Sequence, residues 1–346
     1  MKRLALASLL AGLTLAAALL LHFGLAEVGA ALKAAGALGL LSIAAIHFAA
    51  MALMGVAWWL LAGGRGAVAG PQTFVWGRLI RDSGSEVLPL SQVGGYVLGA
   101  RAIILHGVAA AIATATTVVD VTLELCAQLA YTALGLALLL QLRPETKLAF
   151  PILAGLGAAV VALLGFVGVQ RRGARLLDRL TAFLAREWLS AVAAGAVAVE
   201  TEIHRAYARR GGAFACFLLH LAAWIGTAFE AWLALRLMGA TLDFAAVLVI
   251  ESLLYAVRSV AFFVPNAIGI QEGAYVMLGA SFGIGPDLAL ALSLLKRGRD
   301  LFLGIPALLF WQFVETRRLW SRRAATPRDI PKPPQAPGAG QREYTS

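Results

Sequence analysis

Long apolar runs, separated by short charged or glycine-rich stretches, make up most of the chain. Several runs, among them 4–25, 35–61 and 213–237, reach or exceed the roughly 18 to 20 residues that a membrane-spanning helix needs. They lack the period-two alternation typical of outer-membrane strands, and helices satisfy their own backbone groups in lipid. The pattern therefore predicts an all-α, polytopic membrane protein with about eight spans, some of them broken or re-entrant.

The order of these runs predicts the domain organisation. A transmembrane domain is expected over 1–314, and within it 170–210 is a cytoplasmic amphipathic segment with leucines opposite arginines. Residues 72–82 are expected to form a short interfacial helix. The tail, 315–346, is rich in proline and arginine, which predicts disorder. Because basic residues favour the cytoplasmic side, both the N-terminus and the tail are expected there.

Two segments combine helix breakers with polar residues inside apolar sequence. The first, 85–100, reads SEVLPLSQVGGYVLGA and is expected to be a re-entrant hairpin, and the second begins the stretch 261–300. Broken helices are tolerated at membrane depth where they face protein or a water-filled cavity. The residues expected to act as hinges are Pro89, Gly94 and Gly95 in the first segment and Pro265, Gly269 and Gly273 in the second.

The two broken segments resemble each other. Placing Gln92 on Gln271 aligns QVGGYV with QEGAYV at an offset of 179 residues, about half the chain. Transporters often duplicate a half-molecule and bind substrate at the two broken helices. The charges of the adjoining loops, including Arg78 and Arg81 counted as cytoplasmic, favour a parallel rather than an inverted repeat. Coincidence between two glycine-rich segments is the alternative interpretation.

Charged and polar residues beside the breaks form the candidate site. An isolated charge at the bilayer centre costs several kcal/mol, so these residues are expected to face a protein interior or a polar cavity. The candidates for lipid binding or transport are Glu272, Arg258, Gln271, Asn266, Lys296, Arg297, Arg299, Asp300, Glu86, Gln92 and Arg101. After Lys296 pairs with Asp300, one turn away, positive charge remains in excess. Guanidinium groups bind phosphate and carboxylate, so an anionic or pyrophosphate head group is the expected ligand.

These groups also have structural interpretations. Glu272 follows a break at which a helix restarts, so it can be a capping acid. Glu251 and Arg258 share a helix face and can form a structural ion pair. The charged cluster at 296–300 can be a cytoplasmic loop between two short helices.

The sequence shows no catalytic or metal-binding motif. Asp120 and Glu124, one helical turn apart, are either a proton-relay pair or acids at the interface. The five histidines lack ligand spacing, and Cys126 and Cys216 form no CxxC pair, so we expect no metal, disulfide or cofactor. The chain is 60% hydrophobic, and its net charge of +10 comes largely from loops and tail, which favours a membrane surface over nucleic acid as partner.

Three stretches carry a family resemblance: VPNAIGIQEGAYVMLGA, the following LSLLKRGRDLFLGIPALLFWQ, and the earlier LPLSQVGGYVLGARA. Over roughly residues 1–320 the chain resembles the HpnL family of hopanoid-biosynthesis-associated membrane proteins. That family lies within the wider group that shares the flippase-like transmembrane domain of lysylphosphatidylglycerol synthases. The pattern at Pro265, Gly269, Glu272 and Gly273 recurs across the wider group, whereas KRGRD indicates the hopanoid-linked branch.

The resemblance implies a multi-pass protein of the bacterial inner membrane that moves hopanoids or related lipids and holds their head group at the broken segments. Its implied partners are membrane lipids and enzymes of hopanoid biosynthesis. Two alternatives stay open: an intramembrane enzyme of late hopanoid biosynthesis, and a scaffold that recruits such enzymes through its cytoplasmic parts. Aminoacyl transfer to phosphatidylglycerol is not implied, because no stretch of the sequence could hold an aminoacyl-transferase fold.

Overall fold

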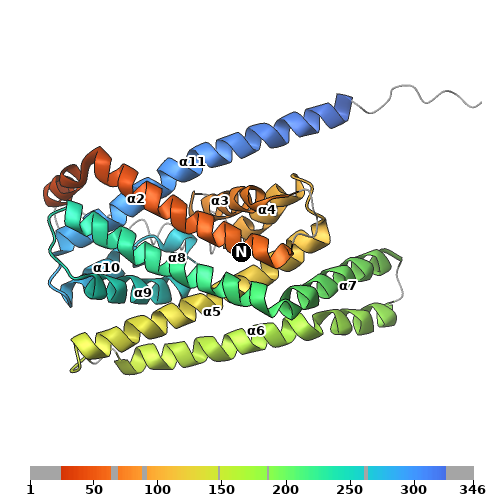
Figure 1. The fold of residues 1–346 in the computed structure, drawn as a ribbon, viewed down its shortest axis with the longest axis horizontal. Helices are drawn as coiled ribbons and strands as arrows, with labels where there is room; N and C mark the ends of the chain where they lie inside the picture. The colour runs from red at the N-terminus through yellow and green to blue at the C-terminus, as the bar shows by residue number, and fades with distance from the viewer. Residues whose placement is uncertain are drawn as a thin grey trace, which may run out of the picture. The chain divides into compact units, whose positions relative to one another are not determined.

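The protein is helical throughout the part of the chain that the computed structural model describes. The described residues are 25–63, 69–87, 92–146, 149–184, 187–260 and 264–324. Their helices are α2 (Leu25–Ala62), α3 (Pro71–Val87), α4 (Gln92–Ile104), α5 (Ala110–Leu142), α6 (Ala149–Leu184), α7 (Glu187–Ala208), α8 (Arg210–Leu237), α9 (Phe244–Val260), the 3-10 helix η1 (Pro265–Ala267), α10 (Ile270–Ala280) and α11 (Pro286–Ala324). Figure 1 shows their arrangement. The predicted all-α class is confirmed.

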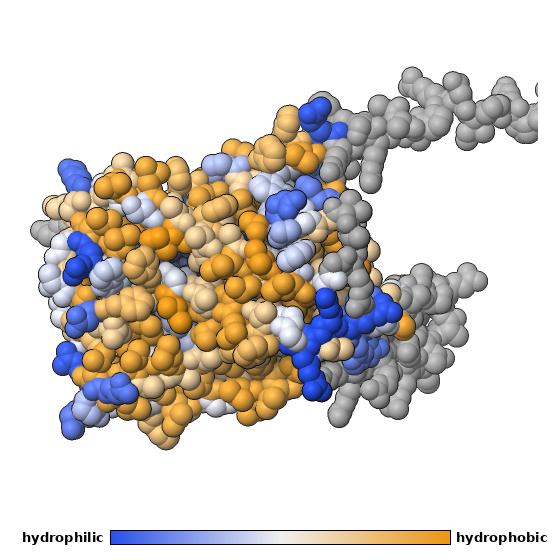
Figure 2. Space-filling model, in the orientation of Figure 1, coloured by the Kyte–Doolittle hydropathy of each residue, from blue (hydrophilic) through white to orange (hydrophobic). Residues whose placement is uncertain are grey.

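Several of these helices suit a lipid bilayer. Four are long and apolar enough to cross one: α2 over Val28–Ala62, α5, α6 over Phe150–Gln170, and α8. Large apolar side chains of α6, such as Phe150, Val161 and Leu164, are exposed. In Figure 2 apolar residues cover the middle of the visible face and hydrophilic residues gather toward its edges. These features confirm a polytopic helical membrane protein.

Some predicted segments fall partly or wholly outside the described residues. The expected first span, 4–25, lies outside them except for its last residue, and so do the side chains of 171–194, where the amphipathic surface was expected. The tail prediction needs correction, because α11 continues to Ala324 and so includes the start of the region expected to be disordered. Arginine, frequent at 315–324, is a good helix former. The chain divides into two units, Met1–Leu308 and Leu309–Ser346, and the candidate site lies within the first.

The order of the helices repeats. In the first half α2, α3, α4 and α5 have 38, 17, 13 and 33 residues. In the second half α8, α9, α10 and α11 have 28, 17, 11 and 39 residues. The matched glutamines fall at equivalent places, since Gln92 begins α4 and Gln271 is the second residue of α10. The repeat seen in six residues therefore extends over four helices in each half.

The two halves run in opposite directions. α2 and α8 are antiparallel, as their successive neighbours show: Gly39 with Leu237, His47 with Glu230, and Leu60 with Gly212. In Figure 1, α2 and the first part of α11 run one way, whereas α5 and α8 run the other way. The repeat is inverted, and the expectation of a parallel repeat is wrong. Its argument counted Arg78 and Arg81 as loop charges, but both are buried inside the bundle.

Each half contains a hairpin of short helices. The first hairpin, α3 with α4, follows the end of α2, and the second, α9 with η1 and α10, follows the end of α8. Because α2 and α8 are antiparallel, the two hairpins enter the bundle from opposite ends. At the tip of the second hairpin Asn266 and Ala267 have positive φ angles of 50° and 45°, a backbone conformation that non-glycine residues adopt at a cost.

Candidate functional site

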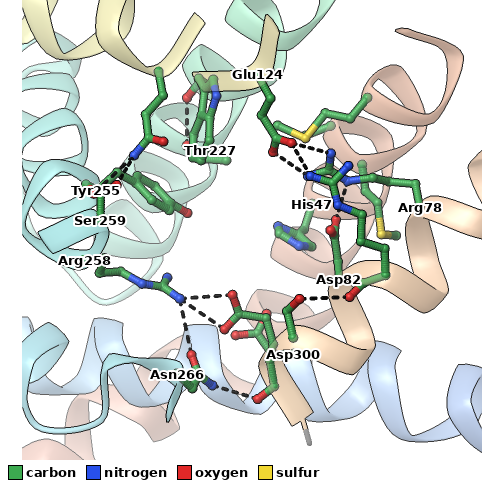
Figure 3. Close-up of a pocket in the computed structure, with 18 of the residues that line it drawn as sticks. His47, Arg78, Asp82, Glu124, Thr227, Tyr255, Arg258, Ser259, Asn266 and Asp300 are labelled. Carbon is green, nitrogen blue, oxygen red and sulfur yellow. Dashed lines mark hydrogen bonds and ion pairs between the residues drawn. The ribbon is translucent and has the colours of Figure 1, made fainter. Parts of the chain in front are cut away.

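A cavity of about 350 Å³ lies between the two hairpins, within the size range of small-molecule sites. Side chains from α2, α3, α4, α5, α8, α9, η1 and α11 line it, and Figure 3 shows many of them converging on one space. Its charged lining residues are four bases, Arg78, Arg81, Arg258 and Arg299, and four acids, Asp82, Glu86, Glu124 and Asp300. The lining is thus balanced rather than basic.

The first charged group joins α3 to α5. Arg78 donates to both carboxylate oxygens of Glu124, at 3.0 and 2.7 Å, and to Asp82 at 2.8 Å. Arg81 donates to Asp120 at 2.7 Å and also to Glu124. Helical spacing places the two arginines on one face of α3 and the two acids on one face of α5. The two arginines, expected on a surface helix, are instead buried among the helices, and so is Asp120, while Glu124 keeps 12% of its side-chain surface exposed.

The second charged group joins the tips of the two hairpins. One guanidinium nitrogen of Arg258, near the end of α9, lies 3.0 and 3.1 Å from the carboxylate oxygens of Glu86 on α3. It also donates to the side chain of Asn266 at 3.2 Å, and Asn266 in turn donates to the backbone carbonyl of Glu86 at 2.8 Å. Figure 3 shows this cluster on the cavity wall. Residues 172 and 180 positions apart thus hold the two tips together.

The third charged group joins α2, α8 and α11. Nδ1 of His47 lies 3.2 Å from Glu230, whose other oxygen accepts a hydrogen bond from Arg299. Arg299 also donates through Nε to Asp300 at 3.1 Å. Glu230 is fully buried, whereas His47 and Asp300 keep 21% and 13% of their side-chain surface exposed, because both line the cavity.

Two further ion pairs lie among the helices around the second hairpin but do not line the cavity. Lys296 donates to Glu251 at 2.7 Å and to the hydroxyl of Tyr275 at 3.0 Å, and that hydroxyl donates to Glu251 at 2.5 Å. Arg297 donates through Nε to Glu272 at 2.7 Å. Each base is therefore neutralised by an acid of a neighbouring helix.

Glu272 sits at the start of α10 as a capping acid. Its carboxylate accepts the backbone N–H of Gly269 at 2.7 Å and the hydroxyl of Ser293 at 2.8 Å, and Ser293 accepts from Gln271 at 2.9 Å. Gly269 has a positive φ of 81°, which favours glycine at this position. The geometry fits the capping interpretation of Glu272, and the ion pair with Arg297 is added to it.

Sequence comparison gives this helical, cavity-bearing domain a family. Residues 4–307 match the family described as the lysylphosphatidylglycerol synthase TM region. The chain belongs to this family. No curated protein and no solved structure matched the chain. Membership of the lysylphosphatidylglycerol synthase TM family indicates a membrane lipid-related function, of the flippase-like kind.

The predicted site residues of this family member divide into three sets. Those that line the cavity are Glu86, Arg258, Asn266, Arg299 and Asp300. Those that lie buried or half-buried outside its lining are Gln271, Glu272, Lys296 and Arg297. Arg101 is exposed in the last turn of α4, and Gln92 begins α4 with its side chain outside the described part. The structure thus brings five of the eleven candidates to one cavity.

The predicted hinges have different roles. Gly95 is a close-packing residue, since a Cβ there would overlap the Ser85 hydroxyl and lie 2.5 Å from the carbonyl oxygen of Arg81. Gly273 lies inside α10, where a Cβ would meet nothing within 4 Å. Pro265 begins η1, and Gly94 lies inside α4. Pro89 falls outside the described residues.

Sequence reasoning missed several lining residues. Arg78, Arg81 and Glu124 were noticed but placed elsewhere, while His47 and its partner Glu230 were not proposed at all. A usable signal was present, because a carboxylate such as Glu230 inside a long apolar helix is by itself a candidate for function. The position of His47 could not be found without knowing that α2 and α8 are antiparallel.

A possible metal-ligand set lies behind the first charged group. Asp120, Cys216 and His220 are buried, and their donor atoms lie within 4.8 Å of one another. His220 Nε2 is 2.9 Å from Asp120, whose other oxygen accepts from Arg81. A hydrogen bond and an ion pair already account for both oxygens of this carboxylate.

Proposed function

We propose that this protein moves a hopanoid or a related lipid across the bacterial inner membrane, with the polar head group held in the cavity between the hairpin tips. The observation that carries the proposal is a charge-lined cavity inside a bundle whose outer surface is apolar. Three of the helices that line it, α2, α5 and α8, are long and apolar enough to span a bilayer. A polar head group that crosses the bilayer needs such a lining, because hydrocarbon offers no hydrogen bonds.

The lining fits a head group that offers both donors and acceptors. Each arginine of the cavity already has a carboxylate partner within the described residues, so the expected excess of positive charge for an anion is not what the site presents. One oxygen each of Asp82 and Asp300 has no donor among those residues. The indole N–H of Trp224 likewise has no acceptor there. Hydroxyl or amine groups of a ligand match these positions better than the anionic or pyrophosphate head group expected from the sequence.

The inverted repeat supports transport. Inverted repeats with a central site allow one half to rock against the other, so that the site opens alternately to the two sides. The hairpin tips meet through the ion pair of Arg258 with Glu86 and the hydrogen bond from Asn266 to the Glu86 carbonyl, and the side chains of Arg258 and Glu86 keep 16% and 23% of their surface exposed. A contact of this kind can break and reform, whereas a large apolar interface could not.

An enzymatic role has weaker support. Asp120 and Glu124, one interpretation of which is a proton-relay pair, both accept hydrogen bonds from guanidinium groups. Neither carboxylate is free to take a proton from a substrate without first losing an ion pair. We therefore keep transport as the proposed function and the inner membrane, with both termini cytoplasmic, as the proposed location.

A vesicle experiment tests the proposal. The full chain is reconstituted into phosphatidylglycerol vesicles that contain a trace of a hopanoid bearing an amine on its polar chain. A membrane-impermeant amine reagent then reports how fast inner-leaflet molecules reach the outer leaflet. Wild-type protein should make the whole hopanoid pool reactive, and the double variant Arg78→Gln, Glu124→Gln should lose this activity.

The matched control is the double variant Arg143→Gln, Glu145→Gln. These two residues lie just beyond the end of α5 and outside the cavity lining, and the substitutions are of the same kind. The control should keep wild-type activity. Equal activity in the wild type and both double variants would contradict a role of the cavity in transport. No activity from correctly folded wild-type protein, together with an unchanged hopanoid distribution in a deletion strain, would reject the transport of hopanoids.

A further inference from the structure

A series of four ionisable side chains in contact begins and ends on the cavity wall. His47 lines the cavity and contacts Glu230, Glu230 accepts a hydrogen bond from Arg299, and Arg299 donates to Asp300, which lines the cavity again. The four groups come from α2, α8 and α11, so both halves of the repeat contribute. The geometry links a titratable imidazole on the cavity surface to a carboxylate that is fully buried behind it.

This series of four side chains lacks one positive charge when His47 is neutral. Two carboxylates, Glu230 and Asp300, then face a single guanidinium, Arg299. An unbalanced charge within a membrane-embedded bundle is unfavourable. A proton on the imidazole removes the imbalance.

The remaining charged groups on the wall do not supply the missing charge. Arg258 of α9 is balanced by Glu86 of α3. On α3 and α5, two bases, Arg78 and Arg81, face three acids, Asp82, Asp120 and Glu124. The lining residues alone are balanced, but with the buried acids Asp120 and Glu230 behind them the charged groups carry an excess of negative charge while His47 is neutral. The compensating cation has to come from solution, either as a proton or as part of a bound molecule.

We propose that His47 and Glu230 form a proton-binding site that exchanges its proton for the positively charged part of a lipid head group in the cavity. The inference rests on the proposed function, because it assumes that a head group enters this cavity. A proton on His47 and an ammonium group near Asp300 supply the same missing charge, so each disfavours the other. Proton uptake from one side of the membrane then drives release of the head group.

Binding measurements on the full chain in detergent test this exchange. The probe is dihexanoyl lysylphosphatidylglycerol, which carries ammonium groups, and the comparison ligand is dihexanoyl phosphatidylglycerol, which carries none. Because protons compete with the ammonium groups of the probe in this exchange, the affinity for the lysyl probe should be about tenfold higher near pH 7.5 than near pH 5.5. Calorimetry in two buffers of different ionisation enthalpy should show that binding of this probe releases protons.

The His47→Gln variant should bind the lysyl probe with nearly the same affinity at both pH values and release no protons. Glutamine keeps a donor for Glu230, and a thermal melt checks that the variant is folded. The matched control is His106→Gln, since His106 is exposed, contacts the carbonyl of Ala102 and lies outside the cavity lining. This control should retain the wild-type pH dependence.

The outcomes separate the two proposals. Tight binding of the lysyl probe with no pH dependence and no proton release overturns the exchange and leaves the head-group cavity intact. A pH dependence that persists in His47→Gln also overturns it, because another group must then titrate. Failure of wild-type protein to bind either probe rejects the cavity as a site for these phosphoglycerol head groups, and the exchange with it.

Discussion

In the first half of the chain the bases lie on the 17-residue helix α3 and their acid partners on α5, whereas in the second half the acid lies on α9 and the bases on α11. Arg78 and Glu124 represent the first arrangement, and Glu251 and Lys296 the second. The helices follow the same order in both halves, but the signs of the charges are exchanged. Each half therefore holds a neutral pair between its 17-residue helix and a long helix, with the signs exchanged.

The two pairs also differ in what they face. Arg78 and Glu124 line the cavity, and three carboxylate oxygens in their group lie within 3.0 Å of a guanidinium nitrogen of Arg78. Glu251 and Lys296 are both buried outside the cavity lining and share the hydroxyl of Tyr275. An ion pair between a short and a long helix thus lines the cavity in the first half and lies in the packed interior in the second half.

The largest expected effect comes from breaking the buried ion pair of Glu251 with Lys296. Lys296→Met leaves Glu251 buried with the Tyr275 hydroxyl as its partner among the described residues, and removing one member of a buried ion pair typically costs about 3–5 kcal/mol. We expect the free energy of unfolding in mixed micelles to fall by about that amount. The double variant Lys296→Met, Glu251→Leu removes both charges and should recover most of the loss. Equal losses of unfolding free energy in the single and double variants would contradict a structural role for this buried ion pair.

A second difference between the halves is the packing of their hairpins. In the first hairpin a Cβ on Gly95 would approach the backbone of α3, and a Cβ on Gly99 would lie 2.7 Å from the Cβ of Arg81. In the second hairpin Gly273, which aligns with Gly94, has open space around it, and Ala274 stands at the place of Gly95. The first hairpin is therefore fixed by close contact, while the second is held by its capping acid and its ion pairs.

This difference predicts opposite effects of the same substitution. Gly95→Ala forces α4 away from α3 and should lower the free energy of unfolding by about 1–3 kcal/mol, as overpacking does. Gly273→Ala is the matched control, because it lies in a regular helix and should raise stability by about 0.4–1 kcal/mol through the unfolded chain. Thermal unfolding of both variants decides the point. A loss of similar size at both positions would show that the second hairpin is packed as tightly as the first.

Much of the architecture could be predicted from the sequence for a physical reason. Apolar runs longer than a bilayer specify membrane helices directly, and the breakers around Gly95 and Gly269 mark the two hairpins. The direction of the second half could not be inferred, because loop charge was the only guide. Arg78 and Arg81 were counted as loop charges, yet Asp120 and Glu124 neutralise them inside the bundle.

The candidate site was predicted less well than the fold. Local sequence indicated Arg258 and Asn266, since both lie beside the break at the second hairpin tip. It also favoured Lys296 and Arg297, because a charge in an apolar run looks functional whether it faces a cavity or a buried partner. Only the packing of α9 and α10 against α11 shows that these bases are matched by acids of their own half.

The smallest expected effect is that of Glu272→Gln. This variant is also the sharpest test of whether the functional site lies at the cavity or at the start of α10. The amide keeps an acceptor for the Gly269 N–H or for Ser293 but weakens the bond with Arg297, whose side chain is 18% exposed and can recover water. We expect a loss of roughly 1 kcal/mol of stability and a lipid-transfer rate in vesicles close to that of the wild type. The cavity double variant Arg78→Gln, Glu124→Gln, measured alongside, should be inactive. The opposite result, in which Glu272→Gln stops transfer without loss of stability, would return the functional centre to the second hairpin and make Glu272 a head-group ligand.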